Sequence, residues 1–432
     1  MINIITRTGD DIDGGRITTE TGSHNRHKGY IEYGKVLANG LDIAGSHSGL
    51  QSDGEKSIYF PERDQVDYGF NNGVASGVDD EDAYKGSLKL SYKDWQFLVY
   101  SSKRTKTVPT AAWDGSFNDS GMYTIDEQTS FEVNYHTTLF PEKNGQLAAR
   151  LYHDTFAYSG EYPFFEEGGW SGTYITNKDE SNSKQWGMEI RYSMDISEKL
   201  AVTAGVEYVD VYEINQKNWD VFPNYALTLD TGTKNNTYHN RACYAQGEYV
   251  LVDDLRLLAG IRLDDYSTAE EQWSPRVALL YSPYSATTLK LLYGEAFRAP
   301  NNYEKFYDDG GWQIGNEELL PEEIKTWEFV WEQKLFKHTR LVSSLYRFDI
   351  ENLIVQVEDT ALQFQNTSKV RSDGAEIHLE SHFANDMKSH LGMSWVDTTY
   401  YDDDRGLDNS PTVSASGGIS IPLFSKKNVH IT

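Results

Sequence analysis

The sequence predicts an all-β protein, an antiparallel β-barrel that spans a membrane with its strands. Three observations predict this fold class: a polar composition with an excess of aromatic residues, an alternation of apolar and polar residues along most of the chain, and a regular succession of short and long connections. A soluble β-sandwich shares the alternation, so the other two observations decide between the two fold classes.

The composition excludes a helical membrane protein. Hydrophobic residues make up 38% of the 432 residues, and no segment approaches the roughly 20 apolar residues that a spanning helix needs. Aromatic residues nevertheless reach 13%, with 29 Tyr and 10 Trp. An outer-membrane barrel predicts this combination, because its strands alternate outward apolar with inward polar residues while Tyr and Trp gather at the two membrane interfaces.

The charge and the cysteine content exclude several other functions. A net charge of -27 would repel a phosphate backbone, so no nucleic acid is expected as a partner. Cys243 is the only cysteine in the sequence, so neither a disulfide framework nor a cysteine-based zinc site can form. Residues 1–7 have a strand pattern and lack the basic start and apolar core of an export signal, so we expect that a further N-terminal portion precedes them.

The alternation is clearest in residues 186–194 and 257–263, where every second residue is apolar. A period of two residues is that of a strand with one apolar face. In a membrane barrel that face meets lipid, and the polar face lines the lumen. The predicted lumen-facing charges are Glu189, Arg191, Arg256 and Arg262.

The connections favour a membrane barrel over a sandwich. Tight turns such as 93–94 and 252–254 alternate with long polar loops such as 159–181, 213–236 and 298–321. This alternation continues through about eighteen strands, which is the asymmetry of a barrel with short periplasmic turns and long external loops. A β-propeller would instead repeat one blade motif at a fixed period, and the sequence has no such repeat.

The predicted external loops are rich in aromatic residues. Buried aromatic side chains offer flat contact area with few rotatable bonds, which suits a planar or amphipathic ligand. The alternative is that these rings pack the loops against one another or belong to the upper interface. The candidate ligand-binding residues are Tyr162, Phe164, Phe165, Trp170, Trp219, Tyr303, Phe306, Tyr307 and Trp312.

Acidic clusters in the same loops are candidate Ca²⁺ ligands, because Ca²⁺ prefers carboxylate oxygens. The alternative is that they are solvated loop carboxylates. The candidate metal ligands are Asp79, Asp80, Asp82, Asp402, Asp403 and Asp404. No catalytic residue is predicted, since the histidines show no partner spacing typical of a hydrolase, and His24 with His27 is too small a set for a metal site.

The segment 245–300 resembles the barrel of TonB-dependent receptors of the bacterial outer membrane. The most specific barrel motif of that family is present here as two parts, Phe297-Arg298-Ala299-Pro300 and the later Gly315-Asn316. The family commonly has proline after this asparagine, and Glu317 departs from that pattern. Residues 2–7 resemble the last strand of the plug domain, so the resemblance covers essentially the whole chain.

The resemblance implies an architecture with missing parts. Receptors of this family form 22-stranded barrels with a plugged lumen, whereas this chain is expected to hold about 18 strands. Residues 1–8 would be a remnant of the plug domain, and residues 9–432 a C-terminally truncated transmembrane barrel. We therefore expect unpaired sheet edges at the first strand, near 16–21, and at the last complete strand, near 412–422.

The resemblance also implies a function, the active import of a scarce ligand across the outer membrane of a Gram-negative bacterium, without enzymatic activity or a resident cofactor. The TonB-ExbB-ExbD system would supply energy through the plug, lipopolysaccharide would surround the barrel, and a ferric siderophore is the first choice of ligand. Cobalamin, haem and saccharides are alternatives, haem the less favoured because residues 300–315 contain no histidine. A passive porin or an adhesin barrel is the alternative from another class.

Overall fold

The computed structural model describes residues 6–64, 71–113, 115–166, 173–222, 228–230, 236–309, 312–367, 369–383, 386–401, 405–407, 410–422 and 430–431. These residues are almost entirely β-structure. The helical elements are α1 (Gly9–Ile12), α2 (Asn302–Phe306), η1 (Pro61–Arg63), η2 (Asn71–Gly73) and η3 (Pro141–Lys143). No helix among the described residues is long and apolar enough to cross a bilayer.

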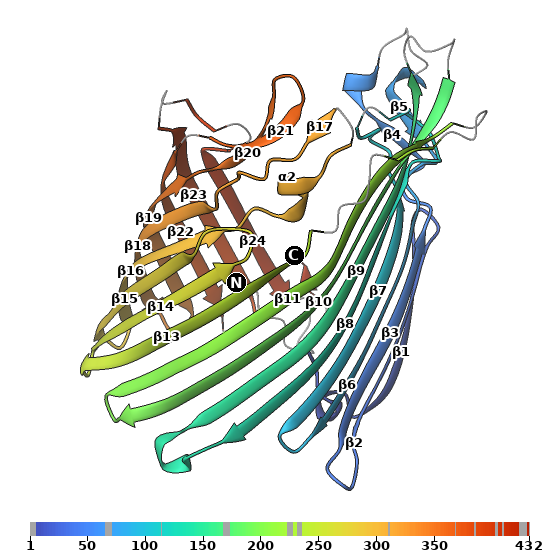
Figure 1. Ribbon diagram of the computed structural model, residues 1–432. Coiled ribbons are helices and arrows are strands. Elements are labelled where there is room, and N and C mark those ends of the chain that lie inside the picture. The colour runs from blue at the N-terminus through green and yellow to red at the C-terminus, as the bar shows by residue number, and fades with distance from the viewer. Residues whose placement is uncertain are drawn as a thin grey trace.

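Eighteen long antiparallel strands form one large sheet in the described part of the chain, to which the short β12 and β25 add, and each long strand pairs with the next long strand along the sequence. Figure 1 shows this sheet curved into a barrel wall. The strands are β1 (Gly14–Gly22), β2 (Arg26–Val36), β3 (Asp42–Ser52), β6 (Glu81–Tyr92), β7 (Trp95–Thr107), β8 (Tyr123–Thr138), β9 (Gln146–Glu166), β10 (Thr173–Ser197), β11 (Leu200–Val221), β13 (Tyr238–Val252), β14 (Leu255–Tyr266), β15 (Gln272–Tyr284), β16 (Thr287–Arg298), β18 (Glu322–Phe336), β19 (Thr339–Glu351), β22 (Val370–His382), β23 (Lys388–Tyr400) and β24 (Val413–Pro422).

Seven short strands accompany the wall in the described residues, and most of them lie at the end where the long connections are. β4 pairs with β5, and β17, β21 and β20 form a small separate sheet near α2. These strands are β4 (Ser57–Tyr59), β5 (Val74–Ser76), β12 (Thr228–Asp230), β17 (Gln313–Ile314), β20 (Ile354–Glu358), β21 (Leu362–Asn366) and β25 (His430–Ile431).

The register turns the apolar face of the wall outward, as predicted. Met188 and Ile190 on β10 are 46% and 48% exposed, although both are apolar. Glu189, between them, instead accepts a hydrogen bond of 2.5 Å from the Tyr244 hydroxyl on the polar face. An exposed apolar face and a hydrogen-bonded polar face are the arrangement of a wall that meets lipid outside and a polar lumen inside.

Aromatic residues bound the apolar face at two levels. Near the short turns, the Trp95 and Tyr135 rings lie 4.7 Å apart. Farther along the strands, His153 packs 4.5 Å from the Trp186 ring and bonds the Tyr212 hydroxyl at 2.7 Å. On β10 the membrane-spanning segment is therefore 186–194, which matches the roughly 9–11 residues of one crossing.

Three strands extend well beyond the membrane. β9, β10 and β11 contain 21, 25 and 22 residues, whereas β14 contains 12. Beyond Trp186 the outward face of β10 becomes charged, and Lys184 pairs with Glu213 at 2.9 Å. The prediction that 159–181 and 213–236 are loops was wrong for most of their described residues, because cross-strand pairs between polar side chains extend the ladder past the hydrocarbon.

β1 and β24, the two strands predicted to be edges, do not pair with each other. β1 pairs only with β2 among the described strands, while β24 pairs with β23 and β25. Within the described residues, the sheet is therefore open between β1 and β24.

The first described residues lie against the polar face of the wall. The Lys89 ammonium donates to the backbone carbonyls of Thr6 and Arg7 at 3.1 and 3.3 Å, and the Gly9 amide donates to the Asp42 carboxylate at 2.6 Å. α1 then leads directly into β1. A domain boundary near residue 8 stays a prediction.

Candidate ligand-binding site

The short helix α2 lies within the upper opening of the barrel (Figure 1). Its first turn is capped by Asn301, whose side chain accepts from the Glu304 amide at 2.9 Å, while the Glu304 carboxylate accepts from the Asn301 amide at 2.8 Å. Such a reciprocal cap satisfies two donors that a helix start leaves open. A helix of only five residues still needs tertiary contacts to hold it.

Arg298, at the end of β16, provides one such contact. Its guanidinium bonds both oxygens of Glu304 at 2.9 Å and one oxygen of Glu322, on β18, at 2.5 Å. Glu304 is only 7% exposed, so its charge depends on this partner. The arginine of the predicted barrel motif thus ties α2 to the wall.

The second part of the motif contacts α2 from its other end. A Cβ atom on Gly315 would lie 2.5 Å from the Lys305 carbonyl oxygen, so only glycine fits between this loop and the helix. The Asn316 amide donates to the Glu304 carbonyl at 3.3 Å, and its side chain donates to the Phe364 carbonyl at 2.8 Å. Arg298, Gly315 and Asn316 are therefore positioning residues for α2.

α2 brings two tyrosines to the inner face of the long strands. The Tyr303 and Tyr307 rings lie 4.6 Å apart, and on β9 the Tyr158 and Tyr162 hydroxyls bond each other. Tyr162 and Tyr307 are buried, at 6% and 8% exposed. With Asp179 of β10, which interacts electrostatically with all four, these residues are here named the tyrosine–aspartate cluster.

The β-ladder fixes the position of Asp179 between β9 and β11. Its cross-strand partners are Gly160 on β9 and Asn218 on β11. A Cβ atom on Gly160 would lie 2.5 Å from the Tyr162 hydroxyl, so the Tyr162 ring occupies the space above this glycine. The Asn218 side chain is held by Asn177, which donates to it at 2.7 Å, and it bonds the Tyr307 hydroxyl.

Burial shifts the acidity of the cluster. It raises the pKa of Asp179 to about 6, and the neighbouring Glu180 carboxylate adds to the shift. Burial also raises the pKa values of Tyr162 and Tyr307 well above 10, so both remain neutral hydrogen-bonding groups at physiological pH. The site therefore contains one titratable carboxylate among neutral hydroxyls.

The other predicted ligand-binding residues lie elsewhere. Phe164 shares the inner face with Tyr162, two residues along β9. Trp219 faces outward, and the Lys217 ammonium lies 4.6 Å from its ring. Trp312 is 65% exposed at the loop surface, and Phe306 is half-buried in α2. The side chain of Phe165 and all of Trp170 lie outside the described residues.

Sequence reasoning missed Tyr158 and Asp179. Tyr158 directly precedes the segment that was predicted to be a loop, and Asp179 stands in a charged run, Lys178-Asp179-Glu180, that resembles a solvated surface. The inner alternation of Ser181, Ser183 and Gln185 continues to Asp179, and this pattern was the available signal. The sequence near Tyr158 and Asp179 does not indicate that they lie close to α2, which follows more than 120 residues later.

The acidic candidates in the first long loop are engaged with other groups. Asp79 pairs with Lys106 and accepts from the Glu55 amide at 2.8 Å, while Asp80 accepts from the Thr107 hydroxyl at 3.0 Å. Asp82 is exposed, and Asp402, Asp403 and Asp404 lie outside the described residues. Within the described ranges, no three His, Cys, Asp or Glu residues are arranged to hold a metal ion. Calcium binding stays a prediction.

The predicted lumen-facing charges all lie on the polar face. Arg262 pairs with Glu207 at 2.9 Å and with Asp264 at 2.8 Å, and Arg256 pairs with Glu248 at 3.2 Å. Arg191 lies two residues from Glu189 on the same face and is exposed. These charges line the wall below the cluster.

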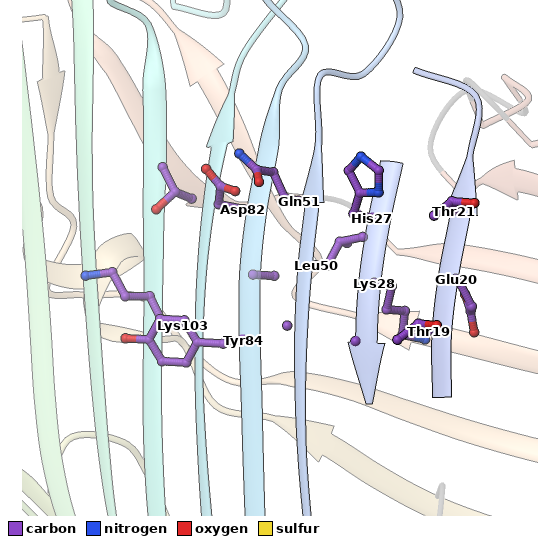
Figure 2. Close-up of a pocket in the computed structure, with 14 residues that line it drawn as sticks. Thr19, Glu20, Thr21, His27, Lys28, Leu50, Gln51, Asp82, Tyr84 and Lys103 are labelled. Atoms are coloured by element: carbon purple, nitrogen blue, oxygen red, sulfur yellow. The ribbon is translucent and has the colours of Figure 1, made fainter. Parts of the chain in front are cut away.

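A shallow depression lies on the other side of the wall, over β1, β2, β3, β6 and β7 (Figure 2). It forms where Gly29 and Gly49 leave the outward face without side chains, between Thr19 and Tyr84. Its register is that of the exposed Ile17 and Ile31. The depression therefore faces the membrane side of the wall and does not lie on a route through the lumen.

Comparison with known proteins agrees with this architecture. The family model of TonB dependent receptor-like β-barrels matches residues 7–422. Among solved structures, the copper transporter OprC aligns with a TM-score of 0.73 at 13% identity, over 94% of this chain and 64% of that one. The siderophore receptor PirA from Acinetobacter baumannii aligns with a TM-score of 0.69 at 13% identity, over 98% and 67%.

A third structure, the ferric-catecholate import receptor Fiu from K12 E. coli, aligns with a TM-score of 0.67 at 14% identity, over 95% of this chain and 69% of that one. The chain thus spans about two thirds of the length of these structures. At such identities the structures share the fold with this chain. TonB-dependent receptors as a family are outer-membrane transporters rather than enzymes. Since the family model covers nearly the whole chain, the protein belongs to the family of TonB-dependent receptor β-barrels.

Proposed function

We propose that the protein imports a ferric siderophore across the outer membrane, using energy that the TonB system delivers from the inner membrane. The observation that carries the proposal is the tyrosine–aspartate cluster in the outer opening of the barrel, where Arg298 holds α2 in place through Glu304. A ligand held there is at the entrance of a polar lumen.

The chemistry of the cluster suits a metal chelate. Tyr162 and Tyr307 are buried and their hydroxyls already bond Tyr158 and Asn218, so little conformational entropy is left to lose on binding. Tyr303 is 37% exposed, so part of its ring is accessible to a ligand. Such a site binds a flat, amphipathic molecule better than a small hydrated ion.

The experiment that tests this proposal separates binding from transport. The full-length protein is produced in cells that lack other ferric-siderophore receptors, with or without a functional tonB gene, and radioactive iron is supplied as a ferric trihydroxamate. Accumulation should occur only in the cells with TonB, whereas iron bound at the cell surface on ice should be equal in both. Equal accumulation in both strains would instead identify a passive porin and refute the proposal.

A further inference from the structure

We propose that the tyrosine–aspartate cluster binds a cationic group, an ammonium or a guanidinium, of the transported metal chelate. This inference rests on the proposed function and names the class of its substrate. It predicts that the protein distinguishes two chelates that hold iron in the same way but differ in the charge of a peripheral group.

The first support is the position of Asp179. Asp179 lies between Gly160 and Asn218 in the ladder, and no hydrogen bond or ion pair within the described residues engages its carboxylate. Buried carboxylates in proteins are normally paired or hydrogen-bonded, because an unpaired charge in a low-dielectric environment is costly. A cation supplied by a ligand would satisfy this carboxylate.

The second support is the group of tyrosines near Asp179. The Tyr158 and Tyr162 hydroxyls on β9 bond each other, and the ring of Tyr303 on α2 lies 4.6 Å from that of Tyr307, which follows α2. All four tyrosines interact electrostatically with the Asp179 carboxylate. Aromatic faces attract ammonium and guanidinium groups through their quadrupoles, and a nearby carboxylate strengthens that attraction. Tyr303 stays partly exposed and Asp179 is half-buried, so a ligand can reach them from the opening.

The third support is that the cations closest to the cluster in sequence are already engaged. Lys178 pairs with Glu161 at 2.7 Å, and Lys305 donates to the Thr268 carbonyl at 2.8 Å. Arg298 is held by Glu304 and Glu322. Their pairing leaves Asp179 as the charge that a ligand meets, which disfavours a polyanionic chelate such as a ferric tris-catecholate.

The test compares two probes that differ only in charge. Purified full-length protein in detergent is titrated with a ferric trihydroxamate that carries one primary ammonium, and with the same chelate after acetylation of that amine, with bound radioactive iron as the readout. We expect the wild type to bind the ammonium form at least about tenfold more tightly. D179N should lose this preference.

E180Q is the matched control, because Glu180 is the adjacent carboxylate but faces outward and is exposed. It should keep the preference of the wild type. Equal affinity of the wild type for the two probes, or a preference that survives in D179N, would overturn the inference. The wild-type comparison needs no variant, so a folding defect in D179N leaves the test decisive.

Failure of this inference and failure of the proposed function give different results. Uptake that depends on TonB but ignores the charge of the chelate would overturn the inference alone. Uptake that is independent of TonB would overturn the proposed function.

Discussion

At the residue scale, Asp179 makes ligand binding depend on pH. Burial raises its pKa to about 6, and a cation binds the ionised form, so affinity for the ammonium-bearing chelate is full above pH 6 and falls as the pH drops through that value. Below it, affinity should weaken roughly tenfold per pH unit. Binding titrations of both probes across this range check the prediction, and the acetylated chelate should show no such slope.

Other ionisable groups lie near the tyrosine–aspartate cluster, and a variant of Asp179 distinguishes its titration from theirs. Glu180 acts directly on Asp179, Asp126 on β8 and Asp309 after α2 act on the tyrosines of the cluster, and Asp220 on β11 accepts a hydrogen bond from Asn177. D179N should give a flat profile for the ammonium chelate. A slope that persists in D179N would assign the titration to one of the other groups.

Single residues also show where sequence reasoning succeeds. The alternation around Met188, Ile190 and Glu189 predicts correctly which side chains meet lipid, because in a barrel the two faces of a strand meet different solvents. Asp179 has the same alternation but lies beyond the hydrocarbon. There, outward residues are polar too, so the pattern no longer distinguishes the inner face from a solvated loop.

At the scale of elements, the account depends on the docking of α2 against the loop at Gly315. A methyl group there would clash with the Lys305 carbonyl oxygen and the Phe306 Cα atom. Both are backbone atoms, so a change of rotamer cannot relieve the clash. G315A should therefore displace α2 and weaken chelate binding by about tenfold, which corresponds to roughly 1.4 kcal/mol. The measurement is the same binding titration.

Gly294 provides the control for this substitution. It lies on β16, the strand that leads to α2, and a Cβ atom there would meet nothing within 4 Å. G294A should bind chelate like the wild type. Normal binding by G315A would show that α2 does not hold the ligand.

The strands of the wall could be predicted from the sequence, whereas the position of α2 could not. The strands of the wall follow from alternation and turns, since each strand pairs with its neighbour in sequence. The meeting of α2 with β9 and β10 does not, because it joins segments that lie far apart in the sequence and depends on the curvature of the whole sheet. Tyr162, Tyr303 and Tyr307 could be predicted as separate candidates, but not as one site.

At the scale of the whole molecule, the orientation of the wall can be tested by placing a charge on either face. I190R puts a charge on the face predicted to meet lipid, which costs about 2–4 kcal/mol near the middle of a bilayer. The amount of folded barrel in outer membranes, measured by its heat-dependent mobility in gels, should fall. S193R places the same charge on the inner face of β10 and should assemble normally, whereas the opposite ranking would reverse the assigned faces.

The open sheet between β1 and β24 predicts the behaviour of residues 1–432 expressed alone. In the described strands, the outer edge of β1 and most of the outer edge of β24 lack ladder partners, and each unpaired group costs several kcal/mol in hydrocarbon. The isolated chain should therefore aggregate when refolded into detergent. Size-exclusion chromatography checks this, and a monomeric, protease-resistant barrel would show that the two edges can close on each other.

The central claim is that this barrel is part of an energy-coupled importer with its ligand site in the outer opening. The most direct measurement is the initial rate of radioactive iron accumulation from the ammonium-bearing ferric trihydroxamate, in cells with the full-length protein, before and after addition of a protonophore. The account predicts that accumulation stops while iron bound at the cell surface is unchanged, and that D179N reduces both. Accumulation that continues at the same rate without a proton gradient would contradict it.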